Sequence, residues 1–238
     1  VGSVQPIKKI SNSLLQIRKG RDFPLIHTDA CQAPTVMSVS PKELGVDLMS
    51  LNGGKIYGPK GIGCLFVRRG IKLAPLIYGG GQEFGLRSGT ENVALAVGFS
   101  RALAVAQNDY KKERKRLAAL SSVLRDGLKK ISGISFNSQN KNCSPTILNV
   151  SFCDIEGESL LLELDKYGIC CSTGSACAST DLKPSYVLLA MGVREEDAHA
   201  SLRFSIGRFT SVKEIKYLLK VLPQAVARIR SICPKISS

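Results

Sequence analysis

Apolar residues recur with helical spacing in several parts of the chain. Residues 7–18 show this spacing, and Gly20 is placed to end the helix. In residues 211–232, Ser211 and Glu214 have the spacing of a capping box, and Pro223 is expected to kink or interrupt the helix. Further helices are predicted over 40–44, 91–131, 157–167 and 184–191.

Short apolar runs without that spacing predict strands. Early in the chain they alternate with helices, which favours an α/β fold with a mainly parallel sheet, whereas the later part looks α+β. Composition shifts near Asn108, so we divide the chain into domains of residues 1–110 and 111–238. The predicted strands cover residues 24–28, 48–51, 64–69, 75–78, 134–137, 146–152 and 200–206.

Composition is that of an ordinary soluble globular protein. The 238 residues are 44% hydrophobic and 22% charged. The longest apolar candidate, residues 93–106, is broken by Arg101, so no membrane-spanning segment is expected, and no secretory signal peptide is recognisable. The eight cysteines lack the regular spacing of a disulfide framework, which favours a reducing compartment.

The net charge of +14 raises the question of nucleic-acid binding. The basic residues are widely spread, and the densest cluster, residues 111–116, lies in the exposed part of a predicted helix. We therefore interpret the charge as a solvated basic face and expect no direct contact with nucleic acid. An acidic protein partner remains compatible with it.

Lys55 is the first candidate for chemistry. It follows the apolar run 48–51 and the turn signal Asn52-Gly53-Gly54, so its side chain stands at the end of a strand, where ligands collect in α/β folds. Taken alone, a solvated turn lysine is the commoner interpretation.

Asp29 and Gln32 occupy the equivalent place after the preceding strand. A lysine that forms a Schiff base and an acid for the ring nitrogen are the pair that a pyridoxal phosphate site requires. The alternative for Asp29 is an ordinary turn or helix cap.

Cysteine and arginine supply further candidates. Cys177 lies in a loop of small residues, where a thiol is poorly placed for a core, whereas Cys170 and Cys171 fit a core position better. Zinc binding by these three cysteines is not expected because the spacing is wrong and a fourth ligand is missing, and we predict no metal site. Arg203, in an apolar strand, requires an anion, which is either a substrate carboxylate or a structural ion-pair partner.

The two histidines give no clear sign of a hydrolase. His27 is near Asp29 in sequence, but a strand histidine with a local partner is the simpler interpretation. No spacing sets His27 or His199 beside a nucleophile as a general base.

Taken together, five segments resemble the NifS/IscS-like cysteine desulfurases of the class V pyridoxal-phosphate enzymes. The resemblance implies the C-terminal part of an aspartate aminotransferase-like large domain followed by a small α+β domain. The segments are His27-Thr28-Asp29-Ala30-Cys31-Gln32, the lysine segment up to Gly58-Pro59-Lys60-Gly61, Gly79 to Glu83 with Arg87 to Thr90, Ser175-Ala176-Cys177, and residues 201–209.

The same resemblance implies the cofactor pyridoxal 5'-phosphate and a set of residue roles. Lys55 would form the Schiff base, Asp29 would hold the pyridine nitrogen protonated, and Gln32 would hydrogen-bond the phenolic oxygen. Thr90 would reach the cofactor phosphate of the partner subunit in a homodimer. Arg203 would hold the carboxylate of L-cysteine, and Cys177 would take its sulfur as a persulfide. That sulfur would pass to an acceptor protein for iron–sulfur clusters or tRNA thiolation, in the cytoplasm or, in a eukaryote, in the mitochondrial matrix.

Two departures from the family pattern affect the expected cofactor binding and catalysis. Asn52 and Gly54 replace the usual serine and histidine of the segment Ser-Gly-His-Lys, so we expect weakened cofactor binding. The family also has about half of its cofactor domain ahead of the residue that matches Val1. We therefore expect a C-terminal part of a desulfurase that does not catalyse efficiently alone.

Two other functions remain open. One is a related class V enzyme, such as a selenocysteine lyase or an aminotransferase. The loop cysteine Cys177 speaks against an aminotransferase. The other is a catalytically incomplete interaction module that keeps the small domain and its partner surface.

Overall fold

The structure is a computed structural model that describes residues 1–138, 141–174 and 183–232. The chain forms two compact units. The first unit is Gln5–Arg114, and the second unit combines Val1–Val4 with Lys115–Ser238. The division falls inside the 36-residue helix α3 (Val93–Leu128), which contributes residues to both units.

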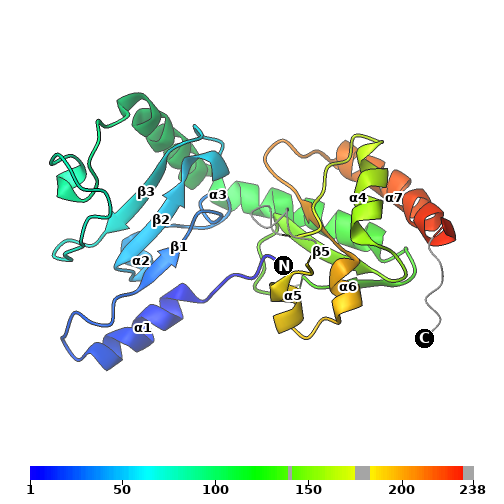
Figure 1. Cartoon of the computed structure of the whole chain (residues 1–238), viewed down its shortest axis with the longest axis horizontal. Helices are drawn as coiled ribbons and strands as arrows, with labels where there is room; N and C mark the ends of the chain where they lie inside the picture. Colours follow the sequence, from blue (N-terminus) through cyan, green and yellow to red (C-terminus); the bar gives the residue numbers. More distant parts are fainter. Residues whose placement is uncertain (139–140, 175–182, 233–238) are drawn as a thin grey trace. The chain divides into compact units, whose positions relative to one another are not determined.

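The first unit contains a three-stranded sheet in the order β1-β2-β3 (Figure 1). β1 pairs in parallel with β2, and β2 pairs antiparallel with β3. The α/β class is confirmed, but among the described strands of this sheet the parallel pair does not predominate. The elements before α3 are α1 (Ile7–Arg18), β1 (His27–Asp29), α2 (Pro41–Leu44), β2 (Leu48–Asn52), the 3₁₀ turns η1 (Gly53–Lys55) and η2 (Glu83–Gly85), and β3 (Gly63–Val67).

Local signals explain where α2 starts and where α1 stops. Ser40 caps α2 by accepting the Glu43 N–H at 3.3 Å, and Pro41 occupies the first turn, where its missing N–H costs nothing. α1 ends at Lys19, which adopts the left-handed conformation with φ 47°. Both helices match the predicted ranges.

One face of the first sheet packs against an apolar core. Met49 and Leu51 of β2 point into this core, where they meet Phe99 of α3. At the amino end of β2, the buried carboxylate of Asp47 pairs with Arg18 and with Arg68 Nε at 2.7 Å. Asp47 also accepts the Ile26 N–H at 2.8 Å, so the charge is paired and hydrogen-bonded where it is buried.

The second unit contains an antiparallel sheet in the order β4-β5-β6. Its helices α4 and α7 pack against one another, and the buried carboxylate of Glu163 on α4 accepts Lys166 Nζ at 2.6 Å and Arg228 Nη1 at 3.3 Å. The elements are β4 (Ile134–Phe136), β5 (Ile147–Phe152), α4 (Gly157–Asp165), α5 (Tyr186–Ala190), α6 (Glu195–His199), β6 (Ser201–Ser205) and α7 (Val212–Ile232).

Three expectations about elements were wrong. Residues 75–78 form no strand: Ile77 makes a single bridge to Arg87, and Leu76 and Tyr78 are exposed, so this run has no core to face. The interruption of α7 expected as one possibility at Pro223 is not found, since the helix continues through this residue. The first strand is His27–Asp29, later than predicted.

Candidate functional site

Asp29 and Lys55 come from the carboxyl ends of two neighbouring strands. Asp29 is the last residue of β1 and pairs in register with Ser50 of β2. Lys55 lies in η1, the turn that follows directly after β2. Because β1 and β2 are parallel, their carboxyl ends lie at the same edge of the sheet, which is where ligands bind in open α/β sheets. Both side chains are exposed.

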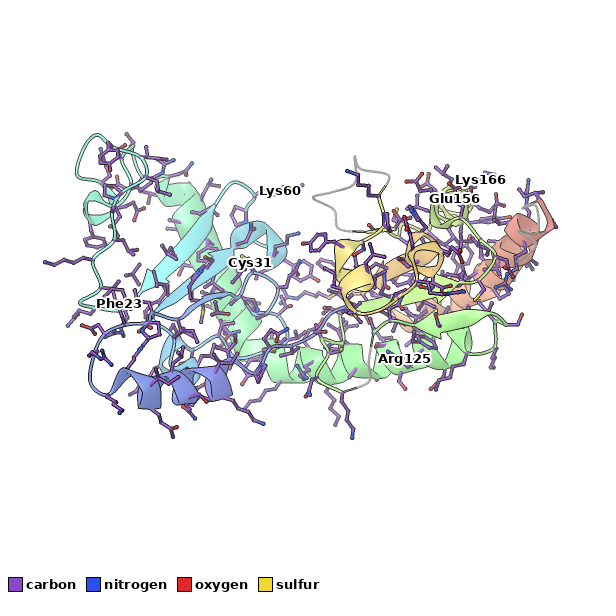
Figure 2. All side chains as sticks on the ribbon, turned by 60° about the horizontal axis from the view of Figure 1, so that its bottom comes forward. Phe23, Cys31, Lys60, Arg125, Glu156 and Lys166 are labelled. Atoms are coloured by element: carbon purple, nitrogen blue, oxygen red, sulfur yellow. The ribbon has the colours of Figure 1, made fainter. Side chains whose placement is uncertain are left out.

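Cys31 connects these two charges. Its backbone N–H donates to Asp29 Oδ1 at 2.9 Å, and Figure 2 labels the residue beside the first sheet. Burial raises the pKa of the Cys31 thiol to about 11, with help from hydrogen bonding to Asp29 and from its charge, while the charge of Lys55 acts in the opposite direction. Lys55 therefore lies within electrostatic reach of the Asp29–Cys31 turn.

The Asp29 carboxyl is held ionised. Hydrogen bonding from the Cys31 side chain, followed by the Cys31 backbone N–H, lowers its pKa below the usual value. Burial opposes this shift, and the charge of His27 reinforces it. The edge thus presents a fixed anion near an amine.

Ser50 is a site residue that the sequence did not single out. Its Oγ lies 2.8 Å from Nε2 of His27, and the register of β1 on β2 puts both side chains on the face that carries Asp29. The available signal was a lone hydroxyl inside the apolar run 48–51. The simple interpretation of His27 as a strand histidine with a local partner is thus supported by a named partner.

The turn between β2 and Lys55 leaves no space for a side chain at Gly53 but leaves space for one at Gly54. A Cβ on Gly53 would lie 2.7 Å from the Pro59 carbonyl oxygen and 2.9 Å from Ile62 Cγ2. A Cβ on Gly54 would meet nothing closer than Asn52 Oδ1 at 3.4 Å. Asn52, Gly54, Gln32 and Thr90 are all exposed, so each can offer a polar group to a ligand.

These residues fit pyridoxal phosphate as judged by the donors present. An amine, an ionised carboxylate and the exposed amide of Asn52 lie along the carboxyl edge of β1 and β2 and the turn that follows. Among the described residues, no group of three or more His, Cys, Asp or Glu side chains is arranged to hold a metal ion.

Arg203 lies in the second unit, in the middle of β6. It pairs in register with Asn149, and its backbone N–H donates to the Ser172 carbonyl at 2.6 Å. Its side chain is half-buried, and among the described residues it has neither an ion pair nor a side-chain hydrogen bond. The structural ion pair considered for Arg203 is therefore not found there, which leaves the guanidinium able to bind an anion.

The remaining cysteine expectations have mixed outcomes. Cys177 lies outside the described residues. Cys170 was expected in the core but is exposed, since it follows the end of α4 in an irregular segment. Cys171 is half-buried, and burial, with the charges of Cys170 and Asp165, raises its pKa to about 11.

Comparison with known proteins gives a consistent result. The family model for the aminotransferase class-V family matches residues 1–218. Cysteine desulfurase IscS 1 of Archaeoglobus fulgidus is 42% identical over 234 residues, which cover 98% of this chain and 60% of that protein. Cysteine desulfurase IscS of Dictyoglomus turgidum is 43% identical over 235 residues, which cover 98% of this chain and 58% of that protein.

Solved structures similar to this chain are also NifS-like proteins. A NifS-like protein superposes with a TM-score of 0.84 at 34% identity, covering 96% of this chain and 58% of that chain. A NifS-like protein from Rickettsia africae gives a TM-score of 0.83 at 28% identity, and the match covers 95% of this chain and 59% of that chain. The chain spans about three fifths of the length of the relatives it matches. In the part of the chain that the structure describes, no helix is both long and apolar enough to cross a membrane.

Proposed function

The chain belongs to the aminotransferase class-V family, and on that premise we propose that it carries the lysine and thiol chemistry of a cysteine desulfurase. The proposed reaction takes sulfur from L-cysteine, releases L-alanine and leaves a persulfide on Cys177. The observation that carries the proposal is the placement of Lys55 and the ionised Asp29 at one edge of the first sheet. The cysteine desulfurase names of the curated relatives support it.

Cysteine desulfurases of this family depend on pyridoxal phosphate. When bound, this cofactor supplies an electron sink that allows a carbon–sulfur bond to break. In the proposal, the Lys55 amine would hold the cofactor through its aldehyde and would move protons. The Asp29 carboxylate would accept a hydrogen bond from the protonated ring nitrogen, and its lowered pKa keeps it charged for that role.

Four further residues would hold the cofactor. Gln32 would donate to the phenolic oxygen, and Asn52 would donate to the phosphate. Gly54 would offer the phosphate only its backbone N–H, because it has no side chain. In a homodimer, Thr90 would supply a hydroxyl to the phosphate bound by the partner subunit. Each of these residues is exposed and so can reach a ligand.

Arg203 and Cys177 act on the substrate in this proposal. The planar guanidinium of Arg203 holds the L-cysteine carboxylate through two parallel hydrogen bonds, and no anion among the described residues competes for it. The Cys177 thiolate attacks the substrate sulfur. The carbon–sulfur bond breaks, the substrate carbon gains a proton to give alanine, and a sulfur–sulfur bond forms on Cys177. An acceptor protein then takes the terminal sulfur, in a cytoplasmic setting.

Mass spectrometry of the chain after incubation with the cofactor and L-cysteine tests this proposal. We expect alanine together with a mass gain of one sulfur atom on the Cys177 peptide, at a rate below that of the Archaeoglobus fulgidus relative. A Cys170→Ser control should behave like the parent chain, whereas Cys177→Ser should lose both products.

Two results would overturn the proposal. Full sulfur release by Cys177→Ala, with no persulfide on the parent, would assign the chemistry to a lyase such as a selenocysteine lyase. No cofactor-dependent alanine under any condition would assign the chain to a non-catalytic interaction module.

A further inference from the structure

A cavity of about 530 Å³ lies in the first unit, away from the candidate site. Its lining comes from the end of α1 and the turn after it, from α2 and the turn into β2, and from the end of β3. Asp47, which directly precedes β2, belongs to this lining, whereas Lys55 follows β2. The cavity therefore lies at the end of the sheet opposite to the end that carries Lys55 and Asp29.

Contacts between α1 and the end of α2 hold the lining in place. Ser11 of α1 is buried, and its hydroxyl donates to the Leu44 carbonyl at 2.7 Å. A Cβ on Gly45, which lines the cavity, would lie only 2.6 Å from Ser11 Oγ, so the two segments approach too closely for a side chain at this position. Because these contacts fix the lining, little conformational freedom is lost when a ligand binds.

Four charged side chains of the lining neutralise one another. The buried guanidinium of Arg18 pairs with Asp47 and donates to the Pro24 carbonyl through Nε at 2.7 Å. Arg68 pairs with Asp47 through Nε at 2.7 Å and with Asp22 through Nη2 at 3.2 Å. Two arginines and two aspartates thus contribute no net charge.

Two further cations of the lining lack a counter-ion. Arg21 and Lys42 are exposed, and neither forms an ion pair with any residue that the structure describes. The side chain of Arg21 makes one long hydrogen bond, from Nε to the Arg18 carbonyl at 3.5 Å. The cavity therefore carries an excess of two positive charges.

A buried N–H group adds to the attraction for an anion. Arg18 is 7% exposed and has five N–H donors. The donors on Nε and Nη2 go to the Pro24 carbonyl and to Asp47, and one donor on Nη1 reaches Asp47 Oδ1 at 3.5 Å. The second donor on Nη1 has no acceptor within the described part of the chain. A ligand oxygen that accepts this N–H would remove the cost of leaving it without a partner.

Apolar side chains form much of the remaining wall. Val46 is buried, Phe66 is half-buried, and Leu15 is 57% exposed. Apolar walls with a few convergent polar groups are typical of small-molecule sites, and the volume is in the range of such sites. The lining is thus suited to an anion that carries an apolar group.

We propose that this cavity binds a small organic dianion with an apolar body, either a phosphate monoester or a dicarboxylate. Two negative charges match the excess contributed by Arg21 and Lys42, and the apolar body would cover Leu15 and Phe66. Guanidinium groups bind phosphate and carboxylate oxygens through two-pronged contacts. Such binding is independent of desulfurase activity and of pyridoxal phosphate.

Methyl-resolved NMR of the chain at pH 7.5 and low salt tests the cavity directly. The probes are phenyl phosphate and phenylsuccinate, both of which are largely doubly charged at this pH. We expect at least one of them to shift the methyl signals of Leu15 and Val46 in a saturable way. The signals of Leu162, which is exposed on α4 of the second unit, should stay unchanged.

Two simpler compounds separate the contributions of charge and apolar contact. Inorganic phosphate has no apolar body and should bind about tenfold more weakly than the better probe. Neutral 2-phenylethanol has the ring without the charges and should cause no saturable shift. Comparison of phenyl phosphate with phenylsuccinate then shows which anionic group the cavity prefers.

Variants of exposed charges locate the binding. Arg21→Glu and Lys42→Glu should each weaken it by about tenfold or more, because an attractive charge becomes a repulsive one. Lys9→Glu is the matched control, since Lys9 is an exposed lysine of α1 outside the lining, and it should change the affinity by about twofold or less. Asp22→Asn should tighten binding by about threefold, because exposed Asp22 competes with the ligand for Arg68.

Lys55→Ala should bind the probe as the parent chain does, because Lys55 lies at the opposite end of the sheet. Three outcomes would overturn the proposal. One is the absence of a saturable shift at Leu15 and Val46 with either probe. The second is an equal loss of affinity in Lys9→Glu and in the two cavity variants, which would indicate general attraction to a basic surface. The third is loss of binding in Lys55→Ala, which would assign the probe to the candidate site.

None of these measurements involves alanine formation or a persulfide. A chain that binds the probe but makes no alanine would contradict only the proposed function. A chain that makes alanine but shows no saturable shift would contradict only the dianion site.

Discussion

Gly53 and Gly54 are neighbours in sequence, yet only Gly54 has room for a side chain. At Gly53 an added Cβ would approach a backbone carbonyl, which cannot move aside without shifting the turn. At Gly54 the nearest atom would be the flexible amide of Asn52 at ordinary contact distance. The absence of a side chain at position 54 is therefore not imposed by packing.

Gly54→His should tighten the binding of pyridoxal phosphate by about tenfold, which corresponds to about 1.4 kcal/mol. The physical reason is that the imidazole would add a hydrogen-bond donor for the cofactor phosphate. Equilibrium titration of the cofactor followed by absorbance measures the effect. Gly53→His is the control and should weaken binding by distorting the turn. Equal affinity in Gly54→His and the parent would contradict the assigned role of this turn.

Asp47 shows how a buried charge can support the sheet from the end opposite the site. Burial alone would oppose its ionisation, but hydrogen bonds from Arg18, from the Ile26 N–H and from Arg68 hold its pKa below the usual value. A carboxyl whose pKa is lowered by folding stabilises the protein above its unfolded pKa of about 4, and that contribution is lost as the pH falls through the folded value.

Asp47→Asn should lower the free energy of unfolding at pH 7 by about 3 kcal/mol, because it leaves buried Arg18 without its counter-ion. The difference between variant and parent should be smaller at pH 3, which is below the unfolded pKa of about 4, because protonation of Asp47 in the unfolded parent then favours unfolding. Urea unfolding at the two pH values measures this. Asp22→Asn, which touches only the exposed part of Arg68, should change the free energy by about 0.5 kcal/mol or less. A difference that persists unchanged at pH 3 would refute the explanation.

At the scale of elements, helix ends were predictable because their signals are local. The capping box that begins α7 forms as expected, with Ser211 N–H donating to Glu214 Oε2 at 2.7 Å and Glu214 N–H donating to Ser211 Oγ at 3.3 Å. The strand and turn that present Lys55 were also expected from the apolar run and the glycines that follow it.

Long-range pairing was not predictable from local patterns. Val1–Val4 belongs to the second unit because Val4 N–H donates to the Asn142 carbonyl at 2.7 Å, a contact that no spacing in the sequence signals. The His27–Ser50 hydrogen bond depends on the register of β1 on β2, and the antiparallel direction of β3 depends on where the chain returns. Helix α6 was missed because it has a single buried residue, Ala198, and no apolar repeat.

Helix α7 tolerates Pro223 at a position exposed to solvent. Seven other residues of the helix are buried, so packing of that apolar face keeps the helix continuous although proline cannot donate a backbone hydrogen bond. Tertiary packing has therefore overridden a strong local signal.

Pro223→Ala should raise the free energy of unfolding of the second unit by about 2 kcal/mol, because it restores a backbone donor and removes the ring from the helix interior. Thermal unfolding followed by circular dichroism reports the change as a higher Tm. Gln224→Ala, at the next exposed position, should have an effect of about 0.5 kcal/mol or less. A Tm that stays the same or falls in Pro223→Ala would show that the proline is accommodated without cost.

At the scale of the whole molecule, the proposed roles are divided between the two units. The first unit supplies Asp29 and Lys55, and the second supplies Arg203 and the segment that includes Cys177. The central claim concerns the first unit alone, because it requires only that the amine of Lys55 binds the cofactor aldehyde beside Asp29. It can therefore be tested independently of sulfur transfer and of any partner polypeptide.

Reductive trapping is the most direct test of that claim. The chain is incubated with pyridoxal phosphate, reduced with borohydride and mapped by peptide mass spectrometry. We predict that the cofactor is fixed on Lys55 and that Lys55→Ala loses the label, while Lys60→Ala, at an exposed lysine in the same loop, keeps it. Labelling spread evenly over the exposed lysines, or undiminished in Lys55→Ala, would contradict the claim.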